Sequence, residues 1–322
     1  MLRPFVWIAA ALSFATACKT ECHPYGSVEG AWVSISVGGN QSCGIKEDGT
    51  ILCWGGLYED ELCPPEEPFA QVSVGAKHAC GVTTDHSALC WGTETDGDLN
   101  APEGEAVEVA AGENFSCGIA GVNGTRICWG NNQYGQAPPE PSDTKFQNID
   151  VAQWHGCGID SAGAHGIECW GSGQWGTTQA PKDGGYIGIS VGWAHSCALK
   201  DSGEVICWGG NGGGKDDKHL TEVPTGTYKR LAAGAFASCA IDSFDQLVCW
   251  GDPTDGVTTN PPDGTFAEVA VGGNRTNNKQ TQHACAIKCD EFDSNGVCSQ
   301  TGKMVCWGNN DDFQATVDPD WN

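Results

Sequence analysis

One sequence unit recurs seven times along the chain with a period of about 40 residues, and this repetition restricts the fold more than any other feature. Each copy begins with a strand-like run that ends at or near a glycine, and each copy finishes at a Cys-Trp-Gly motif. The tryptophans of that motif are Trp54, Trp91, Trp129, Trp170, Trp208, Trp250 and Trp307. A period of this length, built from three short candidate strands, indicates a β-propeller or a β-solenoid. Seven copies suit a closed ring and no distinct end caps are visible, so we predict an all-β, seven-bladed β-propeller of short, mostly three-stranded blades.

The composition agrees with many short strands joined by glycine turns. The 322 residues include 46 glycines, and no long stretch places apolar residues at helical spacing, so we expect almost no helix. The net charge is −25, and no basic stripe offsets it. Such a surface repels phosphate backbones, and the sequence therefore predicts no nucleic-acid partner.

The spacing of the cysteines predicts one disulfide in each blade. If Glu47-Asp48-Gly49 forms a hairpin loop with Gly49 in the left-handed conformation, then Cys43 lies opposite Cys53. Opposed residues of antiparallel strands have Cα atoms about 4.5 to 5.5 Å apart, a distance that a disulfide can bridge. The same reasoning, with slightly longer loops in some blades, predicts the pairs Cys43–Cys53, Cys80–Cys90, Cys117–Cys128, Cys157–Cys169, Cys197–Cys207, Cys239–Cys249 and Cys285–Cys306.

Five of the 19 cysteines remain after this pairing. Cys289 and Cys298 can close an insertion in the seventh repeat, and Cys22 and Cys63 can join the N-terminal segment to the first connection. Cys18 is then left alone. Zinc binding is the alternative for these thiols, but the repeat contains no Cys-x-x-Cys pair, so we predict no metal site.

The N-terminus predicts export. Residues 1–17 carry a weakly basic start and an apolar run too short to span a bilayer, as in a cleaved signal peptide. The following Ala15-Thr16-Ala17-Cys18 resembles the lipobox of bacterial lipoproteins, which predicts lipid attachment at Cys18 and a location at the bacterial outer membrane or cell surface. Residues 18–30 would form a tether and residues 31–322 the propeller. The alternative is a plain secretory signal and a secreted or periplasmic protein.

The repeat resembles a known family. The segment Trp129-Gly130-Asn131-Asn132-Gln133-Tyr134-Gly135-Gln136 is the fullest match to the regulator of chromosome condensation repeat, and similar matches cover almost all of the mature chain. The short period is also similar to that of the β-lactamase inhibitory protein of this superfamily. The resemblance implies a propeller that binds proteins through loops on one face, while the added cysteines resemble exported bacterial members. Guanine-nucleotide exchange belongs to particular nuclear members and is not expected of this chain.

Few residues indicate catalysis or metal binding. A histidine stands two residues before the first repeat cysteine in four copies, at His78, His155, His195 and His283. Other residues fill this position elsewhere, so we interpret these histidines as structural repeat residues; a metal-binding or catalytic role is the alternative. The run from Glu291 to Gly296 faintly resembles a calcium loop but lacks its final glutamate. No catalytic motif is present, so we predict a protein that is not an enzyme and that needs no cofactor.

Aromatic residues mark one set of turns. The turn between the first and second strands of a blade carries Trp154 in the fourth repeat, Trp193 in the fifth and Phe236 in the sixth, and it borders Asn274 and Arg275 in the seventh. Turns of one kind lie on one face of a propeller, so these residues predict a binding patch for a protein partner on blades four to seven. Two alternatives stay open: the rings fold back as core, or exposed tryptophans, including Trp175, stack on sugars.

Overall fold

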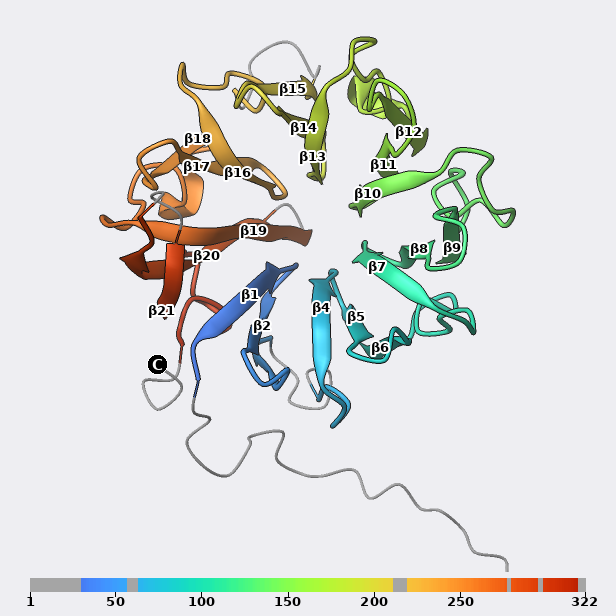
Figure 1. Ribbon diagram of the computed structural model, residues 1–322, viewed down its shortest axis with the longest axis horizontal. Coiled ribbons are helices and arrows are strands. Elements are labelled where there is room, and N and C mark those ends of the chain that lie inside the picture. Colours follow the sequence, from blue (N-terminus) through green and yellow to red (C-terminus); the bar gives the residue numbers. More distant parts are fainter. Residues whose placement is uncertain (1–29, 57–62, 211–218, 277–278, 295–297, 318–322) are drawn as a thin grey trace, which may run out of the picture.

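The computed structural model describes residues 30–56, 63–210, 219–276, 279–294 and 298–317, and these residues form a closed ring of seven blades (Figure 1). Each blade is a three-stranded antiparallel sheet of consecutive strands. The predicted all-β, seven-bladed propeller is therefore confirmed. The first strand of every blade lies nearest the axis of the ring, and the third lies at its periphery.

The three kinds of strand have the following bounds. The innermost strands are β1 (Trp32–Val37), β4 (Phe69–Val74), β7 (Ala106–Ala111), β10 (Phe146–Val151), β13 (Tyr186–Val191), β16 (Tyr228–Ala233) and β19 (Phe266–Thr276). The middle strands are β2 (Gln41–Lys46), β5 (His78–Thr83), β8 (Phe115–Ala120), β11 (His155–Asp160), β14 (His195–Lys200), β17 (Ala237–Asp242) and β20 (Lys279–Phe292). The outermost strands are β3 (Ile51–Gly55), β6 (Ala88–Gly92), β9 (Arg126–Gly130), β12 (Ile167–Gly171), β15 (Val205–Gly209), β18 (Leu247–Gly251) and β21 (Cys298–Gly308).

Helical structure among the described residues includes two short 3-10 turns, η2 (Gln174–Gly176) and η3 (Thr254–Gly256). No helix within these ranges has the length and the apolar character needed to cross a membrane. The seventh blade departs from the others, because β19, β20 and β21 are longer than their counterparts and extend the sheet at both ends.

One disulfide joins the middle and outermost strands of each blade, as predicted. In the first blade Cys43 is the register partner of Cys53, and the two Cα atoms are 4.0 Å apart. The equivalent bonds are Cys80–Cys90, Cys117–Cys128, Cys157–Cys169, Cys197–Cys207, Cys239–Cys249 and Cys285–Cys306. A further disulfide, Cys289–Cys298, joins β20 to β21 in the seventh blade. Cys63 is disulfide-bonded, but the predicted partner Cys22 lies outside the described residues.

The hydrophobic core lies between neighbouring blades. At the interface of blades three and four, Phe115 and Ile119 pack against Phe146, Ile149 and Trp170. The ring of Phe146 lies so close to Gly158 of its own blade that a Cβ there would fall 2.5 Å from a ring carbon. Glycine at this position of the middle strand therefore makes room for the first aromatic residue of the blade, which explains a recurrent feature of the repeat.

The last and first blades meet through the same contacts that join the other blades. The indole nitrogen of Trp129 donates to the carbonyl of Asp98 in the preceding connection, at 2.8 Å. In the same way Trp54 donates to the carbonyl of Gln314, at 3.1 Å. The C-terminal segment thus takes the place of a connection between blades, and the ring closes without exchanging a strand.

Candidate binding face

The propeller has two chemically different faces. We call the end at which each innermost strand turns into the middle strand the inner-turn face, and the opposite end, where the middle strand turns into the outermost strand, the outer-turn face. The connection that leaves each outermost strand begins on the inner-turn face, since its first residue bonds to the inner turn of the same blade: the Ser172 nitrogen donates to the Trp154 carbonyl at 2.8 Å. Inner turns and connections therefore build this face together.

Backbone hydrogen bonds tie several neighbouring inner turns to one another. The nitrogen of Gly39 donates to the Gly75 carbonyl at 3.0 Å, and the nitrogen of Gly273 donates to the Gly38 carbonyl at 2.8 Å. Similar bonds start from Ala76, Glu113 and Trp193. These hydrogen bonds between neighbouring blades thus fix the positions of the inner turns on this face.

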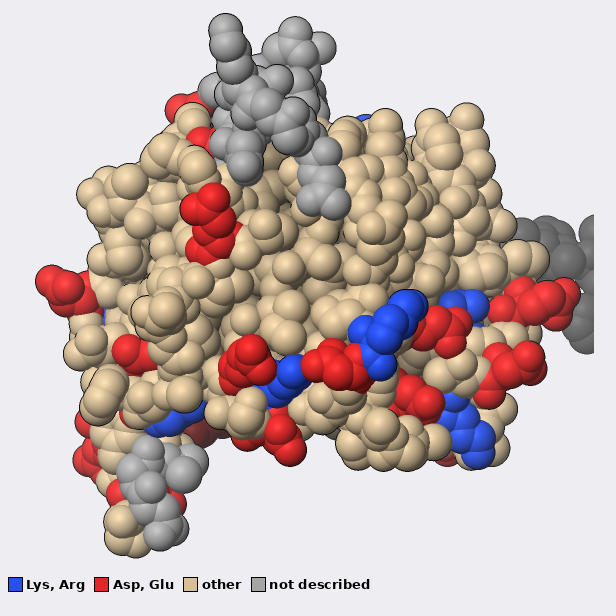
Figure 2. Space-filling view, turned by 90° about the horizontal axis from the view of Figure 1, so that it is seen from above, with Lys and Arg blue, Asp and Glu red and all other residues tan. Residues whose placement is uncertain are grey.

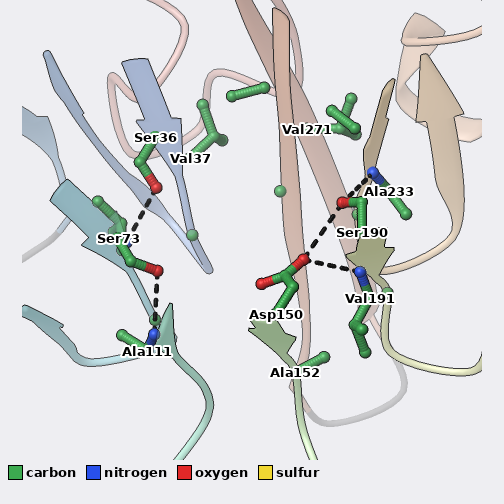
Figure 3. A pocket seen from close by; sticks show the side chains of 18 of the residues that line it. Ser36, Val37, Ser73, Ala111, Asp150, Ala152, Ser190, Val191, Ala233 and Val271 are labelled. Carbon is green, nitrogen blue, oxygen red and sulfur yellow. Dashed lines mark hydrogen bonds between the residues drawn. The ribbon is translucent and has the colours of Figure 1, made fainter. Parts of the chain in front are cut away.

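A channel with a volume of about 360 Å³ runs along the axis and opens between these turns. The innermost strands line it, and short polar side chains bridge from one strand to the next (Figure 3). The Ser73 hydroxyl accepts a hydrogen bond from the Ala111 nitrogen at 2.9 Å, and Asp150 accepts one from the Val191 nitrogen at 2.7 Å. Because these side chains are hydrogen-bonded to backbone nitrogens of the next blade, they hold neighbouring blades together.

Three buried carboxyl groups of the innermost strands, of which Asp150 and Glu268 line the channel, have raised pKa values. Burial raises the pKa of Glu108 to about 8, that of Glu268 to about 7 and that of Asp150 to about 6. Glu108 is held by Asn148, whose side-chain nitrogen donates to Oε1 at 2.7 Å. These groups bind backbone and side chains of the next blade, so their roles are structural.

Each repeat histidine bonds to a serine of the following blade. His195 Nε2 lies 2.7 Å from Ser238 Oγ, and His283 Nε2 lies 2.9 Å from Ser42 Oγ across the closure of the ring. His78 and His155 bond in the same way to Ser116 and Ser196. Burial lowers the pKa values of His78 and His195 to about 4 and those of His155 and His283 to about 3.

These histidines therefore lie between blades, each with a different serine. Within the described ranges, no group of three or more histidine, cysteine or acidic side chains could hold a metal ion.

Three aromatic side chains of blades three and four meet on the inner-turn face. Trp154 lies on the inner turn of blade four, Tyr134 on the connection before this blade and Trp175 on the connection after it. The rings of Trp154 and Trp175 are stacked, with centroids 5.7 Å apart, and Tyr134 lies 5.8 Å from Trp154. Trp175 is 37 % exposed and Tyr134 is 51 % exposed. We call Tyr134, Trp154 and Trp175 the aromatic triad.

The other residues of the predicted patch lie in different surroundings. Trp193 lines the mouth of the channel, and its ring contacts Phe236 with centroids 4.9 Å apart. Phe236 is only 6 % exposed and belongs to a small core with Leu220, so the expectation that Phe236 is an exposed patch residue is corrected. Asn274 also lines the channel mouth. The side chain of Arg275 lies outside the described part of the structure.

Basic side chains are scarce on the inner-turn face. Among the lysines and arginines whose side chains are described, only Lys77 lies in an inner turn or in the start of a connection. Acidic residues there are Glu94, Asp96, Asp98, Glu113, Asp252, Asp255, Asp311 and Asp312. Figure 2, a view along the plane of the ring, shows the basic side chains gathered on one side among acidic ones. The two faces therefore differ in charge as well as in shape.

The sequence was also compared with models of known families. The model of the regulator of chromosome condensation (RCC1) repeat matches residues 69–98, 106–136 and 186–215, which fall in blades two, three and five. Three of the seven blades thus match the RCC1 repeat. The predicted resemblance is thereby confirmed for the repeat and for the number of blades. No curated protein matches the chain.

Solved structures resemble this propeller over most of its length. The ectodomain of the Arabidopsis thaliana receptor kinase ACR4 is 25 % identical with a TM-score of 0.66, covering 87 % of this chain and 96 % of that one. The Physcomitrella patens receptor kinase CR4 ectodomain is 20 % identical with a TM-score of 0.65, covering 87 % and 74 %. Prp20p from Saccharomyces cerevisiae is 17 % identical with a TM-score of 0.59, covering 72 % and 74 %.

Sequence reasoning placed Trp154 on the inner turn of blade four, where the structure has it, but missed Tyr134 as its neighbour. Tyr134 and Trp175 both stand five residues after the tryptophan of a Trp-Gly motif, where other repeats of this propeller carry Asp96 and Asp255. Trp175 has a left-handed backbone, with φ of 61°. Bulky residues rarely adopt this conformation, whereas aspartate tolerates it better. A tryptophan at this repeat position is thus a sequence signal that could have added Trp175 to the candidate protein-binding site.

Proposed function

We propose that this protein is an exported, non-enzymatic scaffold that binds a protein partner through its inner-turn face, with the aromatic triad at the centre of the contact. The single observation that carries this proposal is the exposed stack of Trp154 and Trp175 beside Tyr134. Tryptophan and tyrosine are enriched where binding energy concentrates in protein interfaces. The strained backbone of Trp175 supports the proposal, since such strain clusters at functional sites.

The proposed contact is centred on blades three to five instead of blades four to seven. Trp193 extends it toward the channel mouth, which Asn274 also lines, and Arg275 remains a contact residue in the proposal. Phe236 contributes by supporting the ring of Trp193 from within the core. A propeller of the same fold is known to bind proteins, because Prp20p was described with its binding to Gsp1p and histones. This similarity supports the proposal that the scaffold binds proteins, but it does not identify a partner of this chain.

Export is supported by the disulfides. A ring with eight described disulfides is typical of an oxidising compartment. In the proposal residues 1–17 are a signal peptide, Cys18 carries the lipid, residues 18–30 are a tether and residues 31–322 the propeller. The first 29 residues lie outside the described structure. Mass spectrometry of the mature protein should show an acylated N-terminus at Cys18, and an unacylated N-terminus there would refute lipid anchoring.

Site-specific photo-cross-linking tests the proposed face. A photoreactive phenylalanine replaces Tyr134 in one variant and Phe244 in another; Phe244 is 75 % exposed and lies in an outer turn. Cells displaying each variant are irradiated, and cross-linked proteins are identified by mass spectrometry. We expect a defined protein adduct from position 134 that is lost when Trp175→Ala is added. Equal adducts from both positions, or adducts from position 244 alone, would contradict the proposal.

Carbohydrate binding is the second candidate, and the stacked geometry of Trp154 and Trp175 favours it because sugar rings pack on flat aromatic faces. A glycan array separates the two candidates. Strong binding of a defined glycan that disappears in both Trp154→Ala and Trp175→Ala would support sugar recognition and overturn the protein-partner proposal.

A further inference from the structure

We infer that the aromatic triad binds a cationic side chain, lysine or arginine, presented by a basic segment of the partner. This inference rests on the proposed function and names the chemistry of the partner. It is carried by three features of the described residues: partly exposed aromatic rings, the absence of an internal cation on them, and the acidic character of the segments that hold them.

The triad offers the ring geometry that cations prefer. Trp154 and Trp175 lie nearly parallel, at 24°, while Tyr134 is tilted by 53° against Trp154. The three rings come from one inner turn and the two connections flanking it, so backbone bonds of the propeller fix their positions. Indole faces are the strongest aromatic partners of ammonium and guanidinium groups. Because one face of Trp175 stacks on Trp154, a long basic side chain would pack on the other face of Trp175 or on the exposed ring of Tyr134.

Other aromatic rings of the chain show the same interaction internally. Lys46 lies over the ring of Trp32 at 4.0 Å, and Arg126 lies over Trp170 at 4.4 Å. Lys200 lies 5.5 Å from the ring centre of Tyr186. Within the described part of the chain, no lysine or arginine covers a ring of the triad. These rings are therefore open to a cation from outside.

The surroundings of the triad favour a positive ligand. Asp96 accepts a hydrogen bond from the side chain of Asn131, at the start of the connection that carries Tyr134. The nitrogen of Glu113 donates to the carbonyl of Ala152, two residues before Trp154. Both carboxylates thus belong to segments that position the triad, and the net charge of the chain is −25. Charge complementarity of this kind steers a basic partner and excludes an acidic one.

Peptide binding to the full chain tests the inference. The probes are three 12-residue peptides of alternating glycine and a variable residue, which is arginine, its neutral isostere citrulline, or glutamate. Affinity is measured by isothermal titration calorimetry at two salt concentrations. We expect the arginine peptide to bind at least about tenfold more tightly than the citrulline peptide, in line with a cation–π contact in a partly desolvated site. Affinity should fall as salt rises.

Matched variants locate the binding. Trp175→Ala should weaken the arginine peptide at least about fivefold. Trp175→Gly removes the same ring, and glycine adopts the left-handed backbone without strain. This second variant therefore controls for a folding defect in Trp175→Ala. Phe313→Ala is the control, since Phe313 is 71 % exposed on the same face but in the connection after blade seven; its affinity should be unchanged.

Equal affinity for the arginine and citrulline peptides, tighter binding of the glutamate peptide, no detectable binding of the arginine peptide, or unchanged affinity in both Trp175 variants would each overturn the inference. If a protein still cross-links from position 134 in that case, the proposed face stands and only the cationic chemistry fails. If no protein cross-links there, the proposed function fails as well.

Discussion

The buried histidines show how single residues join the blades. A serine precedes the first cysteine of a blade wherever the blade before it carries a histidine, as in His195 and Ser238. Where the histidine is replaced, the next blade has no serine: Ala237 is followed by Ala284, and Phe115 by Gly156. Since an unpaired buried polar group is costly, the two residues are present or absent together.

We predict that His195→Ala and Ser238→Ala each lower the free energy of unfolding by about 2 kcal/mol, because each leaves one buried polar partner unsatisfied. The double variant should cost about 1 kcal/mol less than the sum of the two single variants, since it leaves neither partner. Urea denaturation of the four proteins gives the coupling energy. Strictly additive losses would show that the 2.7 Å contact contributes nothing of its own.

The carboxyl of Glu108 and the buried histidines give stability opposite dependences on pH. The pKa of Glu108 is raised from 4.5 to about 8, so the folded protein keeps a proton that the unfolded chain releases. Stability from this group is full below pH 4.5 and is lost as the pH rises through about 8. The pKa of His155 is lowered from 6.5 to about 3, so its contribution is full above pH 6.5 and is lost as the pH falls toward 3.

Glu108→Gln should therefore stabilise the protein increasingly as the pH rises from 4.5 to about 8. Glutamine keeps the oxygen that accepts from Asn148 and carries no charge. At pH 9 the variant should be more stable than the parent protein, on the order of 2 kcal/mol, and at pH 5 the two should differ least. Thermal unfolding from pH 5 to 9 measures this, with Glu105→Gln, on an exposed position, as the control. An identical pH profile for parent and variant would show that Glu108 is ionised at neutral pH.

Each blade is a small sheet that could not be stable alone, and its disulfide compensates locally. The bond between Cys43 and Cys53 closes a loop of ten residues, and Cys43 and Ile45 pack against Phe69 of the next blade. Short isolated sheets bury too little apolar surface to fold by themselves. The blade therefore depends on its cross-link and on its neighbours together.

Replacing both cysteines of one blade should lower the free energy of unfolding by about 2 to 3 kcal/mol, as expected for a loop of this size. We predict this loss for Cys43→Ala with Cys53→Ala, measured by denaturation under non-reducing conditions. Cys289→Ala with Cys298→Ala should cost less, because that bond closes an extension outside the repeated blade. A larger loss from the second pair would mean that the extension itself supports the ring.

Closure makes the seven blades one cooperative unit. Trp54, His283 and Gly273 repeat at the junction of blades seven and one the contacts found at other junctions. The junction of blades seven and one is therefore held by the same kinds of contact as the other junctions. The C-terminal segment completes this junction by supplying the carbonyl of Gln314.

Removal of residues 309–322 should open this junction. The truncated protein loses the hydrogen bond from Trp54 and the buried side chain of Gln314, which together predict a loss of at least about 2 kcal/mol. A truncation that removes only residues 318–322 is the matched control. Calorimetry should show a lower midpoint and a broader transition for the longer truncation alone. Equal midpoints for the two truncations would refute closure through Gln314.

The strands, turns and disulfides could be predicted from the order of residues because they depend on local rules. Alternation along a strand and a glycine in a hairpin place Cys43 opposite Cys53 whatever surrounds the blade. The same rules could not separate Phe236 from Trp154. Both residues occupy the second position after the glycine of an equivalent inner turn or its counterpart, yet one is core and the other stacks at the surface.

The sequence alone determined the number of repeats, the pairing of their cysteines and the face on which each turn lies. Periodicity and strand register determine these features because they act over a few residues. The aromatic triad was decided by the tertiary structure. Its rings come from the inner turn of blade four and the two connections that flank this blade, and only the angle between packed blades brings Tyr134, Trp154 and Trp175 within contact. That angle results from closing the ring, which no local rule contains.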